Sequence, residues 1–287
     1  MTDDTCLAPD PDVRPPTFRM PAGATDTHFH VFGPSRLERL VPQRDYTPPE
    51  AAAASARRLF DALGIERIVV IQASIFGFDN RDQLEEGAAI GLPMRAIVVV
   101  GPDATEPEMR TLHDQGARGI RFIMAHPGGL DPSGIERAAA RASEMGWHLQ
   151  FLLKPAHLVE LEPRLRRLPC PVVIDHMGFL APEQGLEQPG FQALRRLVEA
   201  GTGWVKLSGA YRLSRGAPHY PELRPFAEAL LALRPDRILW GSDWPHVGLR
   251  SGMPNTGDLL ELFGAWVPDD ADRRRILVEN PDALFGF

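Results

Sequence analysis

Short apolar runs and longer amphipathic stretches alternate eight times along this chain, and this alternation restricts the fold more than any other feature. The short runs are rich in β-branched residues, as strands are, and the longer stretches repeat their apolar residues at helical spacing. The predicted strands are residues 24–32, 67–72, 95–100, 118–124, 147–153, 171–176, 204–208 and 237–242. The predicted helices are residues 49–63, 80–91, 106–115, 133–145, 156–168, 191–200, 221–233 and 257–266.

Eight strand–helix units of about 30 residues each predict an α/β fold, the (β/α)8 or TIM barrel, which needs about 250 residues. The main alternative is a doubly wound parallel sheet. That fold usually carries a Gly-x-Gly-x-x-Gly turn after its first strand, and no such turn follows residues 24–32. We therefore predict one barrel domain over residues 23–287, with no linker or repeat that would divide it.

Both ends of the chain depart from the alternating pattern. Residues 1–22 are rich in proline and are expected to form an arm that lies over the barrel or is disordered. Residues 269–280 predict a further helix that Pro281 ends, and the aromatic tail after it is expected on the outside of the barrel. The N-terminus lacks the basic and apolar regions of a signal peptide, and no apolar run reaches the length of a membrane span.

Composition excludes several classes of protein. A formal net charge of −7 and a pI of about 5.7 argue against binding to nucleic acid, which needs a clustered basic surface. The two cysteines, Cys6 and Cys170, are too few for a disulfide scaffold. We expect a cytoplasmic protein with a small-molecule substrate and with no nucleic-acid or membrane partner. The sequence does not predict its oligomeric state.

Polar residues stand at the carboxyl ends of three predicted strands, where an α/β barrel places its chemistry. His28 and His30 lie two residues apart and so share one face of the first strand. His176 ends the sixth strand, with Asp175 expected to orient it or to pair outside the rim. Asp243 follows the eighth strand and is the predicted catalytic base, the alternative being that it only caps a turn.

Five segments resemble the amidohydrolase superfamily and, within it, the lactonase branch that includes 2-pyrone-4,6-dicarboxylate lactonase. They are residues 25–32 (TDTHFHVF), 173–178 (VIDHMG), 206–212 (KLSGAYR), 240–246 (WGSDWPH) and 279–281 (ENP). The resemblance implies a barrel hydrolase in which Asp243 activates water, while His28, His30 and His176 orient the water and polarise a lactone carbonyl. Ester hydrolysis needs such a proton acceptor and such hydrogen-bond donors.

The same side chains are also suitable metal ligands, and zinc is a candidate. A single divalent ion would take its ligands from four residues: His28, His30, His176 and Asp243. For most members of the superfamily the resemblance implies a binuclear site with further ligands from strands four and five. Here the fourth strand offers Arg118 and Arg121, and His148 lies at the beginning of the fifth. We therefore expect either no required cofactor or one divalent ion.

Two arginines are predicted to bind a substrate carboxylate. Arg121 lies in the fourth strand and Arg212 follows the seventh, and an arginine inside a barrel is costly unless it meets an anion. Pairing with a carboxylate of the protein is the alternative for each. By the resemblance, Tyr46 and Ser74 match substrate-contact positions, and Lys154 after the fifth strand is a further candidate.

The sequence differs from the pyrone-dicarboxylate enzyme at two places. Residues 125–129 and Phe179 stand where that enzyme carries basic residues, and the Pro-Gly-Gly loop at 127–129 is more similar to the sugar-acid lactone branch with galactarolactone isomerase. The resemblance implies an amide in that isomerase at the position of Asp243, so the acid favours hydrolysis.

We predict a hydrolase that opens a small carboxylated lactone. A sugar-acid lactone isomerase and a metal-dependent decarboxylase on the same barrel are the enzymatic alternatives. A non-enzymatic binding barrel is disfavoured, because buried polar groups at several strand ends cost stability unless they are used.

Overall fold

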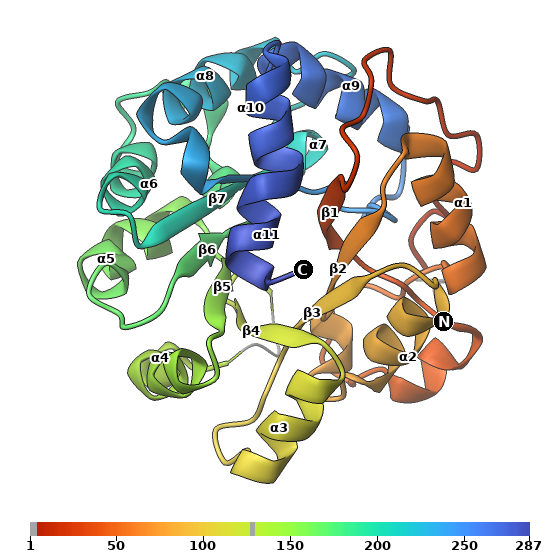
Figure 1. The fold of residues 1–287 in the computed structure, drawn as a ribbon, viewed down its shortest axis with the longest axis vertical. Coiled ribbons are helices and arrows are strands. Elements are labelled where there is room, and N and C mark those ends of the chain that lie inside the picture. Colours follow the sequence, from red (N-terminus) through yellow and green to blue (C-terminus); the bar gives the residue numbers. More distant parts are fainter. Residues whose placement is uncertain (1–4, 127–129) are drawn as a thin grey trace.

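The computed structural model describes residues 5–126 and 130–287 (Figure 1). Its strands form one eight-stranded parallel sheet in chain order, each hydrogen-bonded to the next. They are β1 (Thr25–Phe29), β2 (Arg67–Ile71), β3 (Met94–Val98), β4 (Ala117–Ile123), β5 (His148–Leu152), β6 (Val172–Ile174), β7 (Gly203–Leu207) and β8 (Ile238–Trp240). The predicted (β/α)8 barrel is confirmed.

The barrel closes just beyond the last strand. The N–H of Asp243 donates to the carbonyl of His28 at 2.7 Å, and the N–H of His30 donates to the carbonyl of Trp244 at 2.8 Å. These two bonds join the chain after β8 to β1. The closure therefore sets the predicted base directly beside the predicted histidines.

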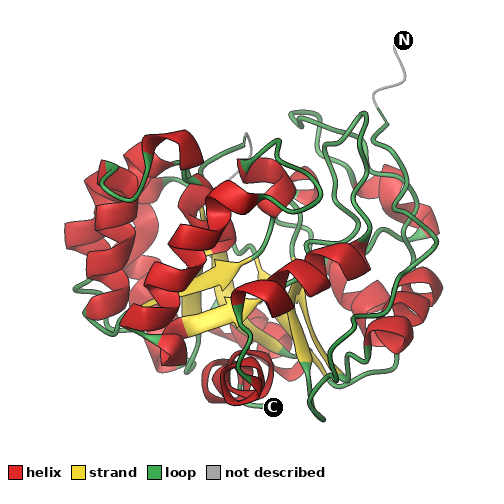
Figure 2. Ribbon diagram, turned by 90° about the horizontal axis from the view of Figure 1, so that it is seen from above, coloured by secondary structure: helices red, strands yellow, loops and turns green. Residues whose placement is uncertain are grey.

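Helices surround the strands on the outside, as Figure 2 shows. They are α1 (Ala53–Leu63), α2 (Arg81–Ala89), α3 (Glu106–Asp114), α4 (Ile135–Glu144), α5 (Pro155–Leu165), α6 (Pro189–Glu199), the single turn α7 (Ala210–Leu213), α8 (Arg224–Leu233) and α9 (Thr256–Trp266). Local signals explain their ends: Thr105 and Glu108 form a capping box before α3, and Gly64 ends α1 at φ 71°. None of the helices in the described chain is long and apolar enough to cross a lipid bilayer.

The amino-terminal end of the barrel interior is closed by apolar side chains. The cluster consists of Val69, Ile71, Ile97, Val173, Trp204, Leu239 and Phe285. Phe285 comes from α11 (Asn280–Phe285), which lies across this end of the ring of strands in Figure 1. Its ring meets that of His148, at the start of β5, with centroids 5.3 Å apart. The expectation that the aromatic tail packs outside the barrel is therefore wrong for Phe285, which is buried against the interior, whereas the ring of Phe287 lies under the guanidiniums of Arg67 and Arg95.

Pro281 does not end the C-terminal helix, contrary to the expectation from the sequence. The chain runs from α10 (Asp270–Arg274) through a π-helical segment (Arg275–Glu279) directly into α11. Pro281 stands in the first turn of α11, where a helix can accept a residue without an N–H.

The described part of the proline-rich N-terminal segment lies along the body of the barrel. The N–H of Leu7 donates to the carbonyl of Leu249 at 3.0 Å, and Arg14 pairs with Asp258 of α9 at 2.9 Å. The side chain of Asn255, just before α9, accepts from the N–H of Arg14 at 3.2 Å. Residues 5–22 thus contact the loop after β8 and the start of α9.

Candidate active site

The carboxyl-terminal half of the barrel interior is polar. Side chains alternate between the two faces of a strand, so polar residues in otherwise apolar strands reveal the inward positions. The inward polar residues at this end, all buried, are Asp26, His28 and His30 from β1 and its continuation, Arg121 from β4, Gln150 from β5 and Lys206 from β7. Because all eight strands are parallel, these groups meet at the same end of the barrel as the loop that carries Asp243.

Both Asp175 and His176 face the interior, although successive strand residues normally point to opposite faces. The strand β6 ends at Ile174, and His176 adopts a left-handed conformation with φ 48° and ψ 48°. This turn brings its ring back toward the barrel axis, where its Nε2 lies 3.8 Å from Oδ2 of Asp243. The sequence predicted His176 as the inward residue, and a single turn brings both side chains inward.

Asp175 is buried and contacts four polar side chains in the part of the chain that the structure describes, but it does not orient His176. Its Oδ1 accepts from Nε2 of Gln150 at 2.8 Å and lies 3.1 Å from Nδ1 of His28, while its Oδ2 accepts from Arg121 at 3.1 Å. The ammonium of Lys206 is 3.7 Å away. Burial opposes ionisation, but the hydrogen bond from His28 and the charges of Lys206 and Arg121 outweigh it and hold the pKa of Asp175 well below its usual value.

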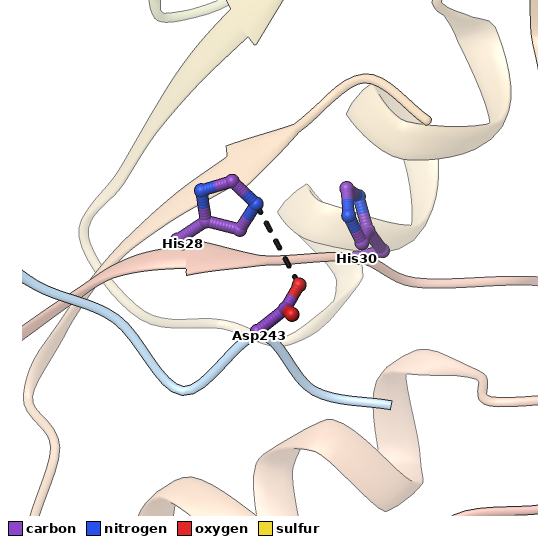
Figure 3. A group of neighbouring side chains, drawn as sticks. All are labelled: His28, His30 and Asp243. Atoms are coloured by element: carbon purple, nitrogen blue, oxygen red, sulfur yellow. Dashed lines mark ion pairs between the residues drawn. The ribbon is translucent and has the colours of Figure 1, made fainter. Parts of the chain in front are cut away.

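The two oxygens of Asp243 have different surroundings. Its Oδ2 accepts hydrogen bonds from the hydroxyl of Tyr211 at 2.7 Å and from Nε of Arg212 at 2.6 Å. Its Oδ1 is buried without a hydrogen-bond partner among the described residues and lies 3.7 Å from Nε2 of His28 (Figure 3). Burial disfavours the charge, but the guanidinium of Arg212 overcomes it, so the pKa of Asp243 lies well below its usual value.

Hydrogen bonds at Nδ1 fix how His28 and His30 face the site. Nδ1 of His30 lies 2.7 Å from the carbonyl of Ile71, and Nδ1 of His28 lies 3.1 Å from the carboxylate of Asp175. The carbonyl of Ile71 can only accept, so Nδ1 of His30 carries the hydrogen and its Nε2 presents a lone pair. Nδ1 of His28 also lies 3.3 Å from the ammonium of Lys206, but the closer, charged carboxylate of Asp175 favours the hydrogen on Nδ1. Burial, with Arg121 next in effect, lowers the pKa of His30 to about 3, so this ring is neutral near pH 7.

The donor set fits one divalent ion. His28, His30 and Asp243 each offer one ligand atom, and these atoms lie within 4.8 Å of one another (Figure 3). Nε2 of His28 and Oδ1 of Asp243 are both buried acceptors that no donor from the described chain satisfies. Neutral histidines anchored through Nδ1, together with an ionised carboxylate, are characteristic zinc ligands.

We expect at most one divalent ion per chain, because this is the one such cluster among the described residues. His148, considered as a fifth-strand ligand, lies at the opposite end of the barrel beside Phe285. Elemental analysis of protein purified without chelators measures the ratio of metal to chain. The His28→Gln variant serves as the matched control and should lose any ion that is bound. Two ions per chain would contradict the assignment.

A small pocket opens beside Asp243 at this end of the barrel. Its lining consists of His30, Tyr46, Ala73, Ser74, Arg121, His126, Leu152, His176, Phe179, Arg212, Asp243, Val247 and Gly248. Most of the predicted substrate contacts are therefore brought together, but Lys154 is exposed at the start of α5 and does not line the pocket. The cavity volume is about 50 Å³.

The two pocket arginines both pair with carboxylates of the protein, the alternative considered from the sequence. Arg121 donates through Nη1 to the carbonyl of Gln72 at 2.6 Å and through Nη2 to Asp175, and it is almost fully buried. Arg212 uses Nε for Asp243, while its side chain keeps 19% of its area exposed. Of the two guanidiniums, Arg212 is the better placed to meet a substrate anion as well.

Several site residues were missed at the sequence level. Lys206, Ser208 and Tyr211 all lie in the segment 206–212, which carried part of the family resemblance, but only Arg212 received a role there. Lys206 is fully buried and donates to the carbonyl of Thr27 at 2.7 Å and to Gln150 at 3.0 Å. A lysine between apolar residues of a predicted strand was the available signal for an inward polar group.

The loop after β4 contributes one described residue to the pocket. His126 lines it, and its Nδ1 lies 2.7 Å from the carboxylate of Asp45 in the loop after β1. The Pro-Gly-Gly sequence at 127–129, on which the similarity to the sugar-acid lactone branch rested, lies outside the described residues.

The sequence of nearly the whole barrel matches one protein family. The family model described as Amidohydrolase matches residues 25–287. The chain belongs to the amidohydrolase family. Its similarity to particular members confirms the resemblance to the lactonase branch, and the barrel is that of an enzyme of this family.

Three relatives illustrate the similarity. The chain is 40% identical to 4-sulfomuconolactone hydrolase of Hydrogenophaga intermedia over 288 residues, covering 98% of this chain and 94% of that protein. It is 34% identical to D-galactarolactone isomerase of Agrobacterium fabrum over 274 residues, covering 94% and 93%. The solved structure of a probable 2-pyrone-4,6-dicarboxylic acid hydrolase from Acinetobacter baumannii with citric acid bound superposes with a TM-score of 0.81 at 28% identity, covering 92% of this chain and 100% of that one.

Proposed function

We propose that this protein is a hydrolase that opens the ring of a small lactone bearing a carboxylate. The observation that carries the proposal is Asp243: it is buried and ionised, one of its oxygens is held by Tyr211 and Arg212, and the other is free to accept a proton. Lactone hydrolases among the relatives support the reaction class.

In the proposed reaction Asp243 acts as the base. A water oxygen bonds to the acyl carbon while Oδ1 of Asp243 takes one of the water's protons, and the carbonyl oxygen becomes an oxyanion. The intermediate then collapses, the ring C–O bond breaks, and the released oxygen receives the proton, so the products are a carboxylic acid and a hydroxyl. Since a carboxylate with a low pKa is a weak base, the reaction depends strongly on donors that stabilise the oxyanion.

Each histidine has its own task in this scheme. Nε2 of His28 lies 3.7 Å from Oδ1 of Asp243 and is a second acceptor that can orient the attacking water. His176 lines the pocket and faces the other oxygen of Asp243, so it is the histidine placed to form a hydrogen bond with the lactone carbonyl oxygen. A divalent ion, where bound, would be held by His28, His30 and Asp243 and would polarise the carbonyl or lower the pKa of water.

Arg212 is proposed to bind the substrate carboxylate. We expect Arg212→Met to raise KM about 10- to 100-fold, the effect of losing charge-assisted hydrogen bonds to an anion. The value of kcat should fall as well, because Nε of Arg212 also holds Asp243. Arg215→Met, an exposed substitution three residues along the chain, is the control and should leave KM unchanged. An unaltered KM in Arg212→Met would remove Arg212 from substrate binding.

A panel of carboxylated lactones tests the function. Hydrolysis releases acid, which a pH indicator detects, and in H₂¹⁸O it places one heavy oxygen in the product carboxylate. Isomerisation, the alternative suggested by the galactarolactone relative, moves a ring bond and incorporates no solvent oxygen. Decarboxylation releases carbon dioxide instead. Conversion of a lactone without ¹⁸O uptake would overturn the hydrolase proposal in favour of the isomerase.

We further propose that residues 23–287 form a single domain, which the continuous eight-stranded sheet supports. We also propose that the protein is cytoplasmic and that its partner is a small-molecule lactone.

A further inference from the structure

The partner of His176 at Nδ1 differs in kind from the partners of the other two site histidines. Nδ1 of His176 lies 2.9 Å from the hydroxyl of Ser208, and both residues are buried. His30 meets a carbonyl, which can only accept a hydrogen, and His28 meets the carboxylate of Asp175 at 3.1 Å and the ammonium of Lys206 at 3.3 Å. A serine hydroxyl can donate as well as accept, so the partner of His176 leaves this ring free to carry its hydrogen on Nε2.

The far side of the ring favours one of the two directions of the hydrogen bond between His176 and Ser208. Nε2 of His176 faces Oδ2 of Asp243 at 3.8 Å. A hydrogen on Nε2 is attracted to that ionised carboxylate, whereas a lone pair there would be repelled by it. With the hydrogen on Nε2, Nδ1 accepts, and Ser208 is the donor.

The residue after Ser208 packs closely against the imidazole of His176. Gly209 follows with φ 65°, and a Cβ added at that position would lie 2.8 Å from Nδ1 of His176 and 3.0 Å from its Cγ. Any other residue would therefore clash with the imidazole and would be strained at this φ. The edge of the ring is also met by Phe179, with centroids 5.6 Å apart. Ser208 and Gly209 together therefore seat His176 in one orientation.

We propose that Ser208 holds His176 as the Nε2–H tautomer, so that His176 is the neutral hydrogen-bond donor to the developing oxyanion. The nature of that acceptor rests on the proposed function. Ser208 acts through His176 and is a positioning residue. The site then combines opposite tautomers: His28 and His30 present lone pairs for water or a metal ion, while His176 presents a hydrogen to the carbonyl oxygen.

Ring-¹⁵N NMR of histidine-labelled protein tests the tautomer without any substrate. The chain has nine histidines, and the His176 signals are identified by their loss in His176→Gln. We expect the unprotonated nitrogen of His176 to be Nδ1 in the wild type and in Ser208→Thr, and a substantial Nδ1–H population in Ser208→Ala. A wild-type His176 with its hydrogen on Nδ1 would overturn the proposal, even if Ser208→Ala fails to fold. An unchanged tautomer in Ser208→Ala would overturn it equally.

Kinetics with a lactone that the wild type hydrolyses provide the second readout. We expect kcat of Ser208→Ala to fall roughly 10- to 100-fold with little change in KM, and Ser208→Thr to restore most of it, because the loss is confined to stabilisation of the transition state. An equal loss in Ser208→Thr would point to packing and contradict the role of the hydroxyl. If the wild type hydrolyses no lactone, the proposed function fails, while the NMR result still decides the role of Ser208.

Discussion

Asp243→Asn is expected to lower kcat for lactone hydrolysis by about 10³-fold, because the amide cannot accept the proton of the attacking water. Asn suits this position sterically: Asp243 has φ 61°, a left-handed conformation that Asn tolerates better than most residues. The amide oxygen can still accept from Tyr211 and Arg212. The substitution therefore removes the proposed base and leaves most of the surrounding geometry in place.

The control for Asp243→Asn is an equivalent change away from the pocket. Asp79 pairs with Arg81 at 2.6 Å, the same separation as that between Asp243 and Arg212, but this pair lies at the surface. Asp79→Asn should leave turnover unchanged. Steady-state kinetics on the cognate lactone, with circular dichroism to verify folding, give the comparison. Turnover of folded Asp243→Asn at the wild-type rate would show that another group is the base.

Asp175→Asn should have the largest effect on stability, lowering the free energy of unfolding by about 3–5 kcal/mol. The carboxylate of Asp175 offsets the buried charges of Arg121 and Lys206. An amide in its place would leave these two cations without their counterion in the interior. It would also let His28 lose its fixed tautomer, since an amide can donate as well as accept, so turnover should fall together with stability.

Urea unfolding followed by tryptophan fluorescence measures this loss. Asp61→Asn is the matched control: it removes an aspartate–arginine pair, with Arg57 at 2.9 Å, in which both side chains are about half exposed. Its expected effect is about 0–1 kcal/mol. If the two variants lose similar free energy, the buried network is not what holds this end of the barrel together.

The fold and part of the site follow from local sequence patterns. Eight alternations of strand and helix predict the barrel, because each pattern depends on neighbouring residues and the parallel connections leave few other topologies. His28 and His30 are assigned to one face by period two alone. Asp243 follows from its place after the last strand. These assignments need only the directions and the ends of the strands, and neighbouring residues in the sequence predict both.

Other parts of the site depend on backbone conformations that the local sequence pattern does not predict. The left-handed turn at His176 brings two successive side chains inward, although successive residues of a strand point to opposite faces. The prediction for the C-terminal segment was wrong for a similar reason. Pro281 is compatible with the first turn of a helix, and Phe285 packs against apolar side chains at the amino-terminal end of the barrel, which come from strands far away in the chain.

The sequence by itself determined the (β/α)8 barrel, the family and the end of the barrel where His28, His30, His176 and Asp243 meet. Only the tertiary structure decided their chemical states. Arg121 forms a hydrogen bond with Asp175, which is 54 residues away in the chain, and His176 forms one with Ser208, which is 32 residues away. The physical reason is that a tautomer or a buried charge is set by the partner that donates or accepts at about 3 Å, and folding chooses that partner.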